Sequence, residues 1–364
     1  MPQFSPEPTH LHGQPPRTAI LYVNLGTPDA ATPSAVRRYL AEFLSDRRVV
    51  EIPPLLWKII LHGVILRTRP RASAAKYAKV WMPEGSPLAV WTSKQADMLR
   101  AWLGEAGHQV LVRHAMRYGN PSVASQLDAL KAEGATRILV LPAYPQYSGT
   151  TTASVADAVF AWGERQRNLP ELRFVQRYHD DPGYIAALAA RVEAHWREHG
   201  KAEKLVLSFH GVPARTLELG DPYHCECHKT ARLLASELGL HKEEVLTTFQ
   251  SRFGRAKWLE PYTQPTLEAL AKGGLKRVDV MCPGFTSDCL ETLEEIDMEV
   301  REAFMHNGGE AFHYIPALND SQRWVAALAG IAQQHMGGWA TRQLPHARSL
   351  EVQAERARAM GAPR

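Results

Sequence analysis

Short apolar runs alternate with longer amphipathic stretches along most of the chain. Runs such as ILYVNL, ILVLPAY and KLVLSFHG are apolar throughout, which is typical of parallel strands covered by helices on both faces. These runs predict strands at 19–24, 109–114, 137–141, 173–177, 204–209, 245–249, 277–281 and 311–315. The amphipathic stretches predict helices near 33–45, 54–66, 70–80, 88–106, 121–133, 151–168, 182–199, 227–239, 262–273, 288–306 and 320–336. This alternation predicts an α/β fold with doubly wound parallel sheets.

The alternation runs through the chain twice, which predicts two similar Rossmann-like domains. We expect the first at 18–165 and the second at 166–336, with ligands bound in the cleft between them. The Pro-rich residues 1–17 predict a flexible N-terminal extension. Residues 337–364 carry five arginines against two glutamates and little aliphatic periodicity, so we expect a weakly ordered basic tail.

Composition narrows the class of protein. Hydrophobic residues make up 45% of the 364 residues and charged residues 22%, which is ordinary for a globular chain. A net charge of +4 is too small to indicate nucleic-acid binding, and four cysteines do not form a disulfide scaffold. No secretory signal is evident, and the apolar stretch 53–66 is interrupted by Lys58 and His62. These features predict a soluble protein of the cytoplasm.

Several common catalytic motifs are missing. The turn after the first predicted strand is NLGTPD, with one glycine in place of G-x-G-x-x-G. The chain also lacks the P-loop, G-x-S-x-G and H-E-x-x-H patterns. This weakens the hypotheses of a nicotinamide or flavin enzyme, a nucleotide hydrolase, an esterase or a zinc protease.

Two positive features follow strands of the second half. His210 comes directly after the apolar run 204–209, at the carboxyl end where active sites of this fold lie, although a hydrogen-bonded loop histidine is the alternative. Asp288, Glu291 and Glu295 are spaced three and four apart after the run 277–281. They form either a carboxylate ladder for protons or a cation, or, at Asp288 and Glu291, an N-cap and its capping box. Glu294 lies off the ladder face.

Two further segments leave alternatives open. YHCECHK places His224, Cys225, Cys227 and His228 close together, but without the second half of a zinc-finger spacing it is more typical of a solvated helix start. The segment 53–80 is an apolar helical stretch followed by basic residues. It is either a core helix with a basic end or an apolar lip with basic anchors, able to hold a flat dianionic ligand or touch a membrane.

Collinear motifs across residues 18–336 resemble the ferrochelatase family, and most closely its Gram-negative bacterial type. The matching stretches include NLGTPD (24–29), FLSDRRV (43–49), KYAKVW (76–81), MRYGNPS (116–122), LPAYPQYSGTTTAS (141–154), SFHGVP (208–213), QSRFGRAKWLEP (250–261) and PGFTSDCLETLEEID (283–297). The resemblance implies a chelatase-type fold and a lyase that inserts ferrous iron into a porphyrin during haem synthesis. Protoporphyrin IX and Fe²⁺ are then the expected partners, with no nucleic acid and no identifiable partner protein.

The resemblance also implies site residues. His210 becomes the active-site histidine and Glu291 the facing carboxylate, both in catalysis and in metal contact, with Asp288 and Glu295 in the acidic ladder. Which of His210 and Glu291 takes the proton and which takes the iron stays open. Other members often carry histidine where this chain has Cys289. The implied porphyrin contacts are Leu25, Arg69, Tyr77, Ser86, Arg117, Tyr118, Trp258 and Phe285.

Cofactor and substrate follow from the same resemblance. Some relatives hold a 2Fe–2S cluster through C-terminal cysteines, and no cysteine follows Cys289 here, so we expect no cluster and no permanently bound cofactor. Relatives that use coproporphyrin III typically carry tyrosine where this chain has Leu25, which favours protoporphyrin IX. The alternatives are a cobalt or nickel chelatase for another tetrapyrrole and a non-catalytic haem or porphyrin carrier. We expect the protein to be cytoplasmic and to contact the membrane surface peripherally through the lip.

Overall fold

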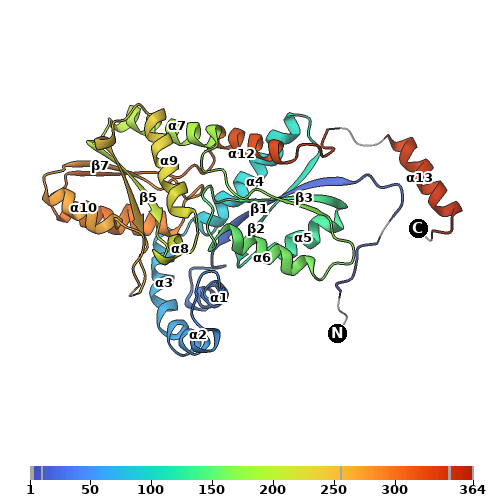
Figure 1. The fold of residues 1–364 in the computed structure, drawn as a ribbon, viewed down its shortest axis with the longest axis horizontal. Coiled ribbons are helices and arrows are strands. Elements are labelled where there is room, and N and C mark those ends of the chain that lie inside the picture. The colour runs from blue at the N-terminus through green and yellow to red at the C-terminus, as the bar shows by residue number, and fades with distance from the viewer. Residues whose placement is uncertain (1–3, 10, 255, 343–345, 363–364) are drawn as a thin grey trace.

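The computed structural model describes residues 4–9, 11–254, 256–342 and 346–362, and within them it contains two parallel four-stranded sheets (Figure 1). The first sheet has the order β2-β1-β3-β4 and the second β6-β5-β7-β8. The strands are β1 Arg17–Gly26, β2 Val110–Tyr118, β3 Ala135–Pro142, β4 Glu171–Phe174, β5 Lys204–His210, β6 Val245–Gln250, β7 Arg277–Met281 and β8 Ala311–Ile315. The predicted α/β class with two doubly wound sheets is confirmed.

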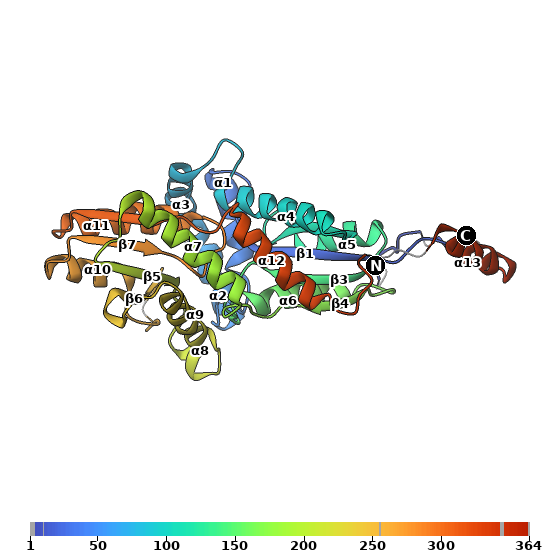
Figure 2. The ribbon, with the colours of Figure 1, turned by 90° about the horizontal axis from the view of Figure 1, so that it is seen from above.

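Helices pack on both faces of each sheet, as the apolar strands require (Figures 1 and 2). Between β1 and β4 the chain forms α1 Pro33–Phe43, α2 Pro54–Ile60, the π-helix η1 Leu61–Ile65, α3 Leu66–Val80, α4 Pro87–Glu105, α5 Val123–Ala132 and α6 Thr152–Gly163. After β4 come α7 Pro182–His199, α8 Arg215–Glu218, α9 Tyr223–Glu237, the 3₁₀ turn η2 Lys242–Glu244, α10 Thr263–Lys272, the π-helix η3 Glu291–Val300, α11 Arg301–His306, α12 Gln322–His335 and α13 Ala347–Ala359.

Helix α7 shows how local sequence sets these bounds. Its N-cap Asp181 accepts a hydrogen bond from the Tyr184 backbone N–H at 2.9 Å, and Pro182 occupies the first helical position. At the other end Gly200 takes φ +77°, a left-handed conformation that favours glycine and stops the helix. The predicted helix at 182–199 is therefore confirmed at both ends.

One buried core joins the two sheets. It contains side chains of the first sheet, such as Tyr22, together with side chains of the second, such as Leu207, and much of α7 and α12. Trp324 of α12 is fully buried, with its ring centroid 6.0 Å from those of Tyr178 and Tyr184. Helix α12 packs against both α4 and α7, so it spans the two halves (Figure 2).

The first sheet extends beyond the boundary that the sequence suggested. β4, Glu171–Phe174, pairs with β3, so the first sheet ends after residue 165 and not before it. The described part of the N-terminal extension also contacts this half: the Ser5 backbone N–H donates to the Arg165 carbonyl at 2.8 Å, and Glu7 pairs with Lys131. The extension, expected to be flexible, is therefore tied to the chain after α6 and to the last turn of α5, while residues 1–3 and 10 lie outside the described part.

The basic C-terminal segment contains a helix that the sequence did not predict. α13, Ala347–Ala359, has no buried residue and lies apart from both sheets (Figure 1). Its hydrophobic residues are too few for an apolar stripe, which is why periodicity did not reveal it. Residues 343–345 and 363–364 of the expected tail lie outside the described residues.

The apolar stretch 53–80 forms α2, η1 and α3 below the first sheet (Figure 1). Trp57 anchors it by donating from Nε1 to the Leu44 carbonyl at 2.6 Å. Four apolar side chains of this region instead face solvent, with exposed fractions of 82% for Leu55, 53% for Leu56, 71% for Ile59 and 54% for Val64. We call these four side chains the apolar lip. In the described part of the chain no helix is long and apolar enough to cross a bilayer.

Candidate active site

His210 ends β5, at the carboxyl edge of the second sheet. Its Nδ1 lies 2.7 Å from the Gly211 carbonyl oxygen, and because that oxygen only accepts, Nδ1 carries the hydrogen. Nε2 of the neutral ring then keeps its lone pair for a proton or a metal ion. Gly211 is required here, since a Cβ at this position would lie 2.8 Å from the Gln250 carbonyl oxygen.

Two aromatic side chains flank His210. The ring centroid of Trp258 lies 6.5 Å from that of His210, and that of Phe285 lies 6.4 Å away. Trp258 is held by a β-bridge to Pro213, while Phe285 sits in the turn after β7. The structure therefore brings together three of the residues that the sequence placed at the site, and the half-buried rings give the histidine apolar, planar neighbours.

Gln250, which sequence reasoning missed, connects His210 with the acidic segment. It ends β6 opposite His210 in the sheet register. Its Nε2 donates to the Glu291 carbonyl at 2.8 Å and lies 3.3 Å from Glu295 Oε2, while Ser208 Oγ donates to its Oε1 at 2.8 Å. A polar residue directly after a buried strand was the signal that could have identified it.

Glu291 and Glu295 lie on η3, a π-helical segment that continues into α11. π-helical turns are rare and frequently occur at functional sites. Glu295 accepts hydrogen bonds from the Ser251 backbone N–H at 2.7 Å and from Ser251 Oγ at 2.5 Å. Burial nevertheless raises the pKa of Glu295, and the nearby Glu291 adds to the rise while His210 opposes it.

Asp288 is not part of an open ladder. Its carboxylate is buried and accepts hydrogen bonds from Tyr314 Oη at 2.5 Å, Asn319 Nδ2 at 2.6 Å and Thr292 Oγ1 at 3.1 Å. The helix begins later, with Leu290 at its N-cap and no capping side chain. The capping-box alternative for Asp288 and Glu291 is therefore wrong, because contacts with the segment after β8 determine the position of Asp288.

Glu294 turns out to be a buried anchor. Its side chain is 1% exposed and accepts from Lys76 Nζ and Lys79 Nζ, each at 3.0 Å. Both lysines belong to α3, so this carboxylate ties the helix that follows the apolar lip to η3. As expected, Glu294 does not share the ladder face of Asp288, Glu291 and Glu295. Its side chain points at α3 instead.

Four of the implied porphyrin contacts lie around the N-terminal half. Leu25 is half-buried at the end of β1, and Ser86 is buried and accepts from Thr27 Oγ1 at 2.7 Å. Tyr77 is buried, and burial together with the nearby Glu291 raises its pKa. The half-buried guanidinium of Arg69 lies 4.2 Å from the ring centroid of Phe253, in the loop after β6. Tyr77 and Arg69 thus connect α3 to the acidic segment and to that loop.

Arg117 and Tyr118 are engaged elsewhere. Arg117 pairs with Asp46 at 2.7 Å and donates to Ser154, and the Tyr118 hydroxyl donates to Asp46 Oδ2 at 2.8 Å. Tyr118 has no exposed surface. In this conformation the two residues hold the chain after α1 against α6 and do not join the group around His210.

The YHCECHK segment does not bring three metal-ligating atoms together in the described part of the chain. It begins α9, where Cys225 is exposed and Cys227 is fully buried, so the two thiols point to opposite sides. His224 and His228 instead pack together, with ring centroids 4.4 Å apart, and burial lowers both pKa values. This arrangement agrees with the structural interpretation of a helix start.

The chain is similar to ferrochelatases over nearly its whole length. The ferrochelatase family model matches residues 17–336. A ferrochelatase from Polaromonas sp. (strain JS666 / ATCC BAA-500) is 67% identical over 99% of this chain and 100% of its own. One from Methylibium petroleiphilum (strain ATCC BAA-1232 / LMG 22953 / PM1) is 68% identical over 99% of each chain.

Solved structures with the same fold are far more distant in sequence. SirB from Bacillus subtilis with Fe3+ matches with a TM-score of 0.52 at 15% identity, over 88% of this chain and 96% of SirB. The sirohydrochlorin chelatase SirB from Bacillus subtilis subspecies spizizenii in complex with cobalt gives 0.51 at 13% identity, over 90% and 100%. At this identity the likeness supports the two-domain chelatase-type fold alone.

Proposed function

The chain belongs to the ferrochelatase family, lyases that insert iron into a porphyrin to make haem, and from this premise we propose that His210 and Glu291 carry the reaction on protoporphyrin IX. The observation that supports this assignment best is the set of contacts around His210. The His210 imidazole carries its hydrogen on Nδ1 and has two aromatic rings as neighbours. Gln250, its partner in the sheet register, donates to the Glu291 backbone carbonyl and to the Glu295 carboxylate.

The reaction exchanges two protons for one dication. Fe²⁺ enters the ring as both pyrrole N–H protons leave, so the site must accept protons beside the incoming metal. In our proposal His210 Nε2 takes the two protons one after the other and releases each to solvent. Glu295, which is close enough to influence the charge of His210, stabilises the imidazolium that forms each time. Glu291 guides the iron, since a carboxylate oxygen is a suitable ligand for Fe²⁺.

His210→Ala tests the first assignment. We expect the folded variant to bind protoporphyrin, seen as a shift of its absorption and fluorescence, but to form haem at least 100-fold more slowly than the unmodified enzyme. Near-normal haem formation by a folded variant would make His210 a structural loop residue.

The substrate is proposed to be protoporphyrin IX. Leu25 supplies an apolar wall and the exposed lip is apolar, which supports this substrate. In our proposal the half-buried guanidinium of Arg69 pairs with a propionate. Anaerobic Fe²⁺ insertion into protoporphyrin IX and into coproporphyrin III, followed by visible absorption, measures the preference. We expect a higher kcat/KM for protoporphyrin IX, and a preference for coproporphyrin III would overturn the assignment.

The remaining proposals concern cofactor and location. We place the enzyme in the cytoplasm, touching the membrane surface through the apolar lip, with iron as substrate and no permanently bound cofactor. The basis for excluding a 2Fe–2S cluster is the sequence, in which no cysteine follows Cys289. Anaerobically purified protein is expected to lack acid-labile sulfide, and stoichiometric sulfide would contradict this proposal.

A further inference from the structure

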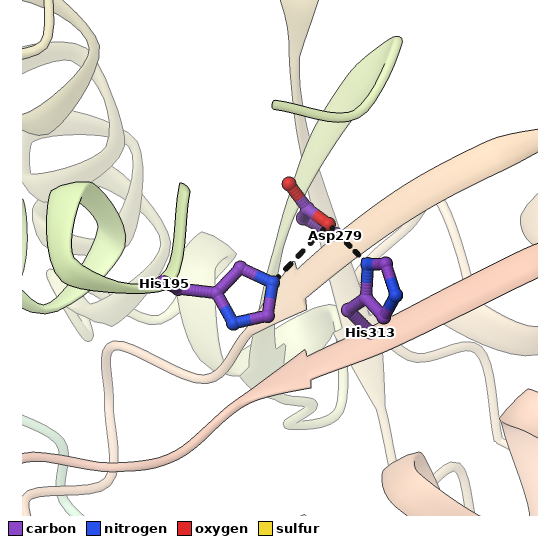
Figure 3. Close-up of side chains that lie close together, drawn as sticks. All are labelled: His195, Asp279 and His313. Carbon is purple, nitrogen blue, oxygen red and sulfur yellow. Dashed lines mark hydrogen bonds and ion pairs between the residues drawn. The ribbon is translucent and has the colours of Figure 1, made fainter. Parts of the chain in front are cut away.

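Two histidines and an aspartate converge on one face of the second sheet (Figure 3). His195 comes from α7, Asp279 from β7 and His313 from β8. Asp279 Oδ1 lies 3.6 Å from His195 Nε2 and 3.2 Å from His313 Nδ1, and the three ligand-type atoms lie within 4.8 Å of one another. Both rings therefore direct a nitrogen toward the same carboxylate oxygen.

Asp279 is a buried carboxylate without a cationic side chain to balance it. It is 1% exposed, and its Oδ2 accepts from Trp196 Nε1 at 2.8 Å and the Ala202 backbone N–H at 3.2 Å. The neighbouring cations are engaged elsewhere: Arg277 donates to the His199 carbonyl, and Lys201 pairs with Glu244. Oδ1 has a hydrogen bond with His313 Nδ1 at 3.2 Å, which does not by itself balance the charge. A buried negative charge without a cationic partner is costly, so Oδ1 is suited to a cation.

His195 supplies the second, independent observation. Its side chain is 9% exposed, and its Nε2 has no hydrogen-bond partner, because the 3.6 Å separation from Asp279 is too long for one. Buried polar atoms are nearly always satisfied, so an unsatisfied ring nitrogen that points at a carboxylate calls for a missing partner. An ion about 2.1 Å from each ligand atom leaves those atoms roughly 3–3.5 Å apart, which is close to the 3.6 and 3.2 Å that separate Asp279 Oδ1 from the two ring nitrogens.

His199 gives this site access to solvent. It lies one turn after His195 on α7, with its ring centroid 4.5 Å from that of His195 and 5.4 Å from that of His313. Its side chain is 43% exposed, so it can serve as a fourth ligand or leave that position to water. A pair of histidines four apart on a helix presents both rings on one face.

We propose that His195, Asp279 and His313 bind one divalent first-row transition-metal ion. Two imidazoles and one carboxylate suit Zn²⁺, Fe²⁺ or Co²⁺, whereas Mg²⁺ and Ca²⁺ prefer oxygen ligands throughout. Asp279 pairs in register with Leu205, five residues before His210 along β5, which is roughly 16 Å of strand. The ion is therefore separate from the iron being inserted, and it fastens the end of α7 to β7 and to the edge strand β8.

Co²⁺ binding to untagged, metal-free protein tests the proposal, with visible absorption and equilibrium dialysis as readouts. The His210→Ala variant, in which the active site is weakened, is expected to keep one tightly bound Co²⁺. A second substitution, His195→Gln or His313→Gln, should weaken Co²⁺ binding more than 100-fold. That exceeds the 10–100-fold loss of affinity typical of removing a residue that only hydrogen-bonds to a metal ligand. His306→Gln, at an exposed histidine of α11, is the matched control and should change nothing.

Zn²⁺ provides a measurement that does not depend on activity or colour. An ion that binds only the folded state raises Tm, so Zn²⁺ should stabilise the His210→Ala protein with or without His306→Gln, but not when it also carries His313→Gln. His313 lies on an edge strand and is 28% exposed, so its variant should fold even if His195→Gln does not. Unchanged Co²⁺ affinity and an unchanged Zn²⁺ effect in folded His313→Gln would overturn the proposal.

Discussion

At the scale of single residues, four carboxylates within one short segment have four different environments. Asp288 is saturated by hydrogen bonds, and Glu294 is buried against two lysines. Glu295 is half-buried and accepts from Ser251, while Glu291 is half-buried near Tyr77. The spacing of Asp288, Glu291 and Glu295 in the sequence suggested one continuous ladder. The structure leaves Glu295 near both His210 and Glu291, so substitutions along the segment should have distinct effects.

Glu291→Gln should lower turnover without unfolding the protein. The change keeps the size of the side chain and removes its charge, so haem formation should fall by roughly 10²–10⁴, the usual contribution of a positioned acid–base or guiding group. Steady-state rates at varied Fe²⁺ and porphyrin check this, with a larger rise of KM for Fe²⁺ than for porphyrin. Glu302→Gln, on the exposed face of α11, is the control, and equal turnover in the two variants would reject the role of Glu291.

Glu294→Gln should lower the stability of the protein and leave its turnover near normal. It removes the charge that holds Lys76 and Lys79, and hydrogen bonds to charged groups contribute about 1.5–3 kcal/mol. We expect the free energy of unfolding, measured in urea, to fall by about that amount while turnover per folded molecule stays near normal. Unaltered stability would mean that solvent replaces the lysines at no cost.

Glu295 predicts a pH dependence of stability. Burial raises its pKa above the reference value of 4.5, so the folded state binds this proton more tightly than the unfolded state. The stabilisation is present below pH 4.5 and is lost as the pH rises through the folded pKa. Tm of the unmodified protein should therefore fall relative to that of Glu295→Gln as the pH increases above 4.5, and parallel curves would contradict the prediction.

At the scale of elements, the apolar runs located most of the secondary structure. β7, β8 and α7 have the predicted bounds because each is a buried run with clear stops. The start of η3 was missed because Asp288 bonds to Tyr314 and Asn319, partners that no local spacing reveals. The cluster of His195, Asp279 and His313 was missed for the same reason, since its members come from three separate elements.

The apolar lip predicts membrane association that can be removed by two substitutions. Leu55 and Ile59 are the most exposed of its side chains, and burying each in a lipid surface contributes about 1.5–3 kcal/mol. Leu55→Ser with Ile59→Ser should lower co-sedimentation with phosphatidylglycerol-containing vesicles more than tenfold. Leu169→Ser, at a leucine 51% exposed in the loop before β4, should bind as the unmodified protein does, and equal binding of all three would exclude the lip.

At the scale of the whole molecule, the repeated strand–helix pattern predicted two domains, but not the core that joins them. Both halves share buried side chains with α12, so they should unfold together. Trp324→Ala should lower the free energy of unfolding by about 3–5 kcal/mol in a single transition. Circular dichroism and tryptophan fluorescence in urea check this, and two separate transitions would show that the halves are independent.

The position of α12 near the end of the chain has a consequence for protein synthesis. Domains generally begin to fold from the N-terminus while the ribosome is still working. Here the first sheet is complete at β4, yet Tyr22 and Leu139 share their core with Leu328 and Ile331 of α12, which are translated much later. A ribosome that stops before residue 322 therefore releases a chain with an uncovered apolar sheet, a substrate for chaperones and proteases and not a smaller working enzyme.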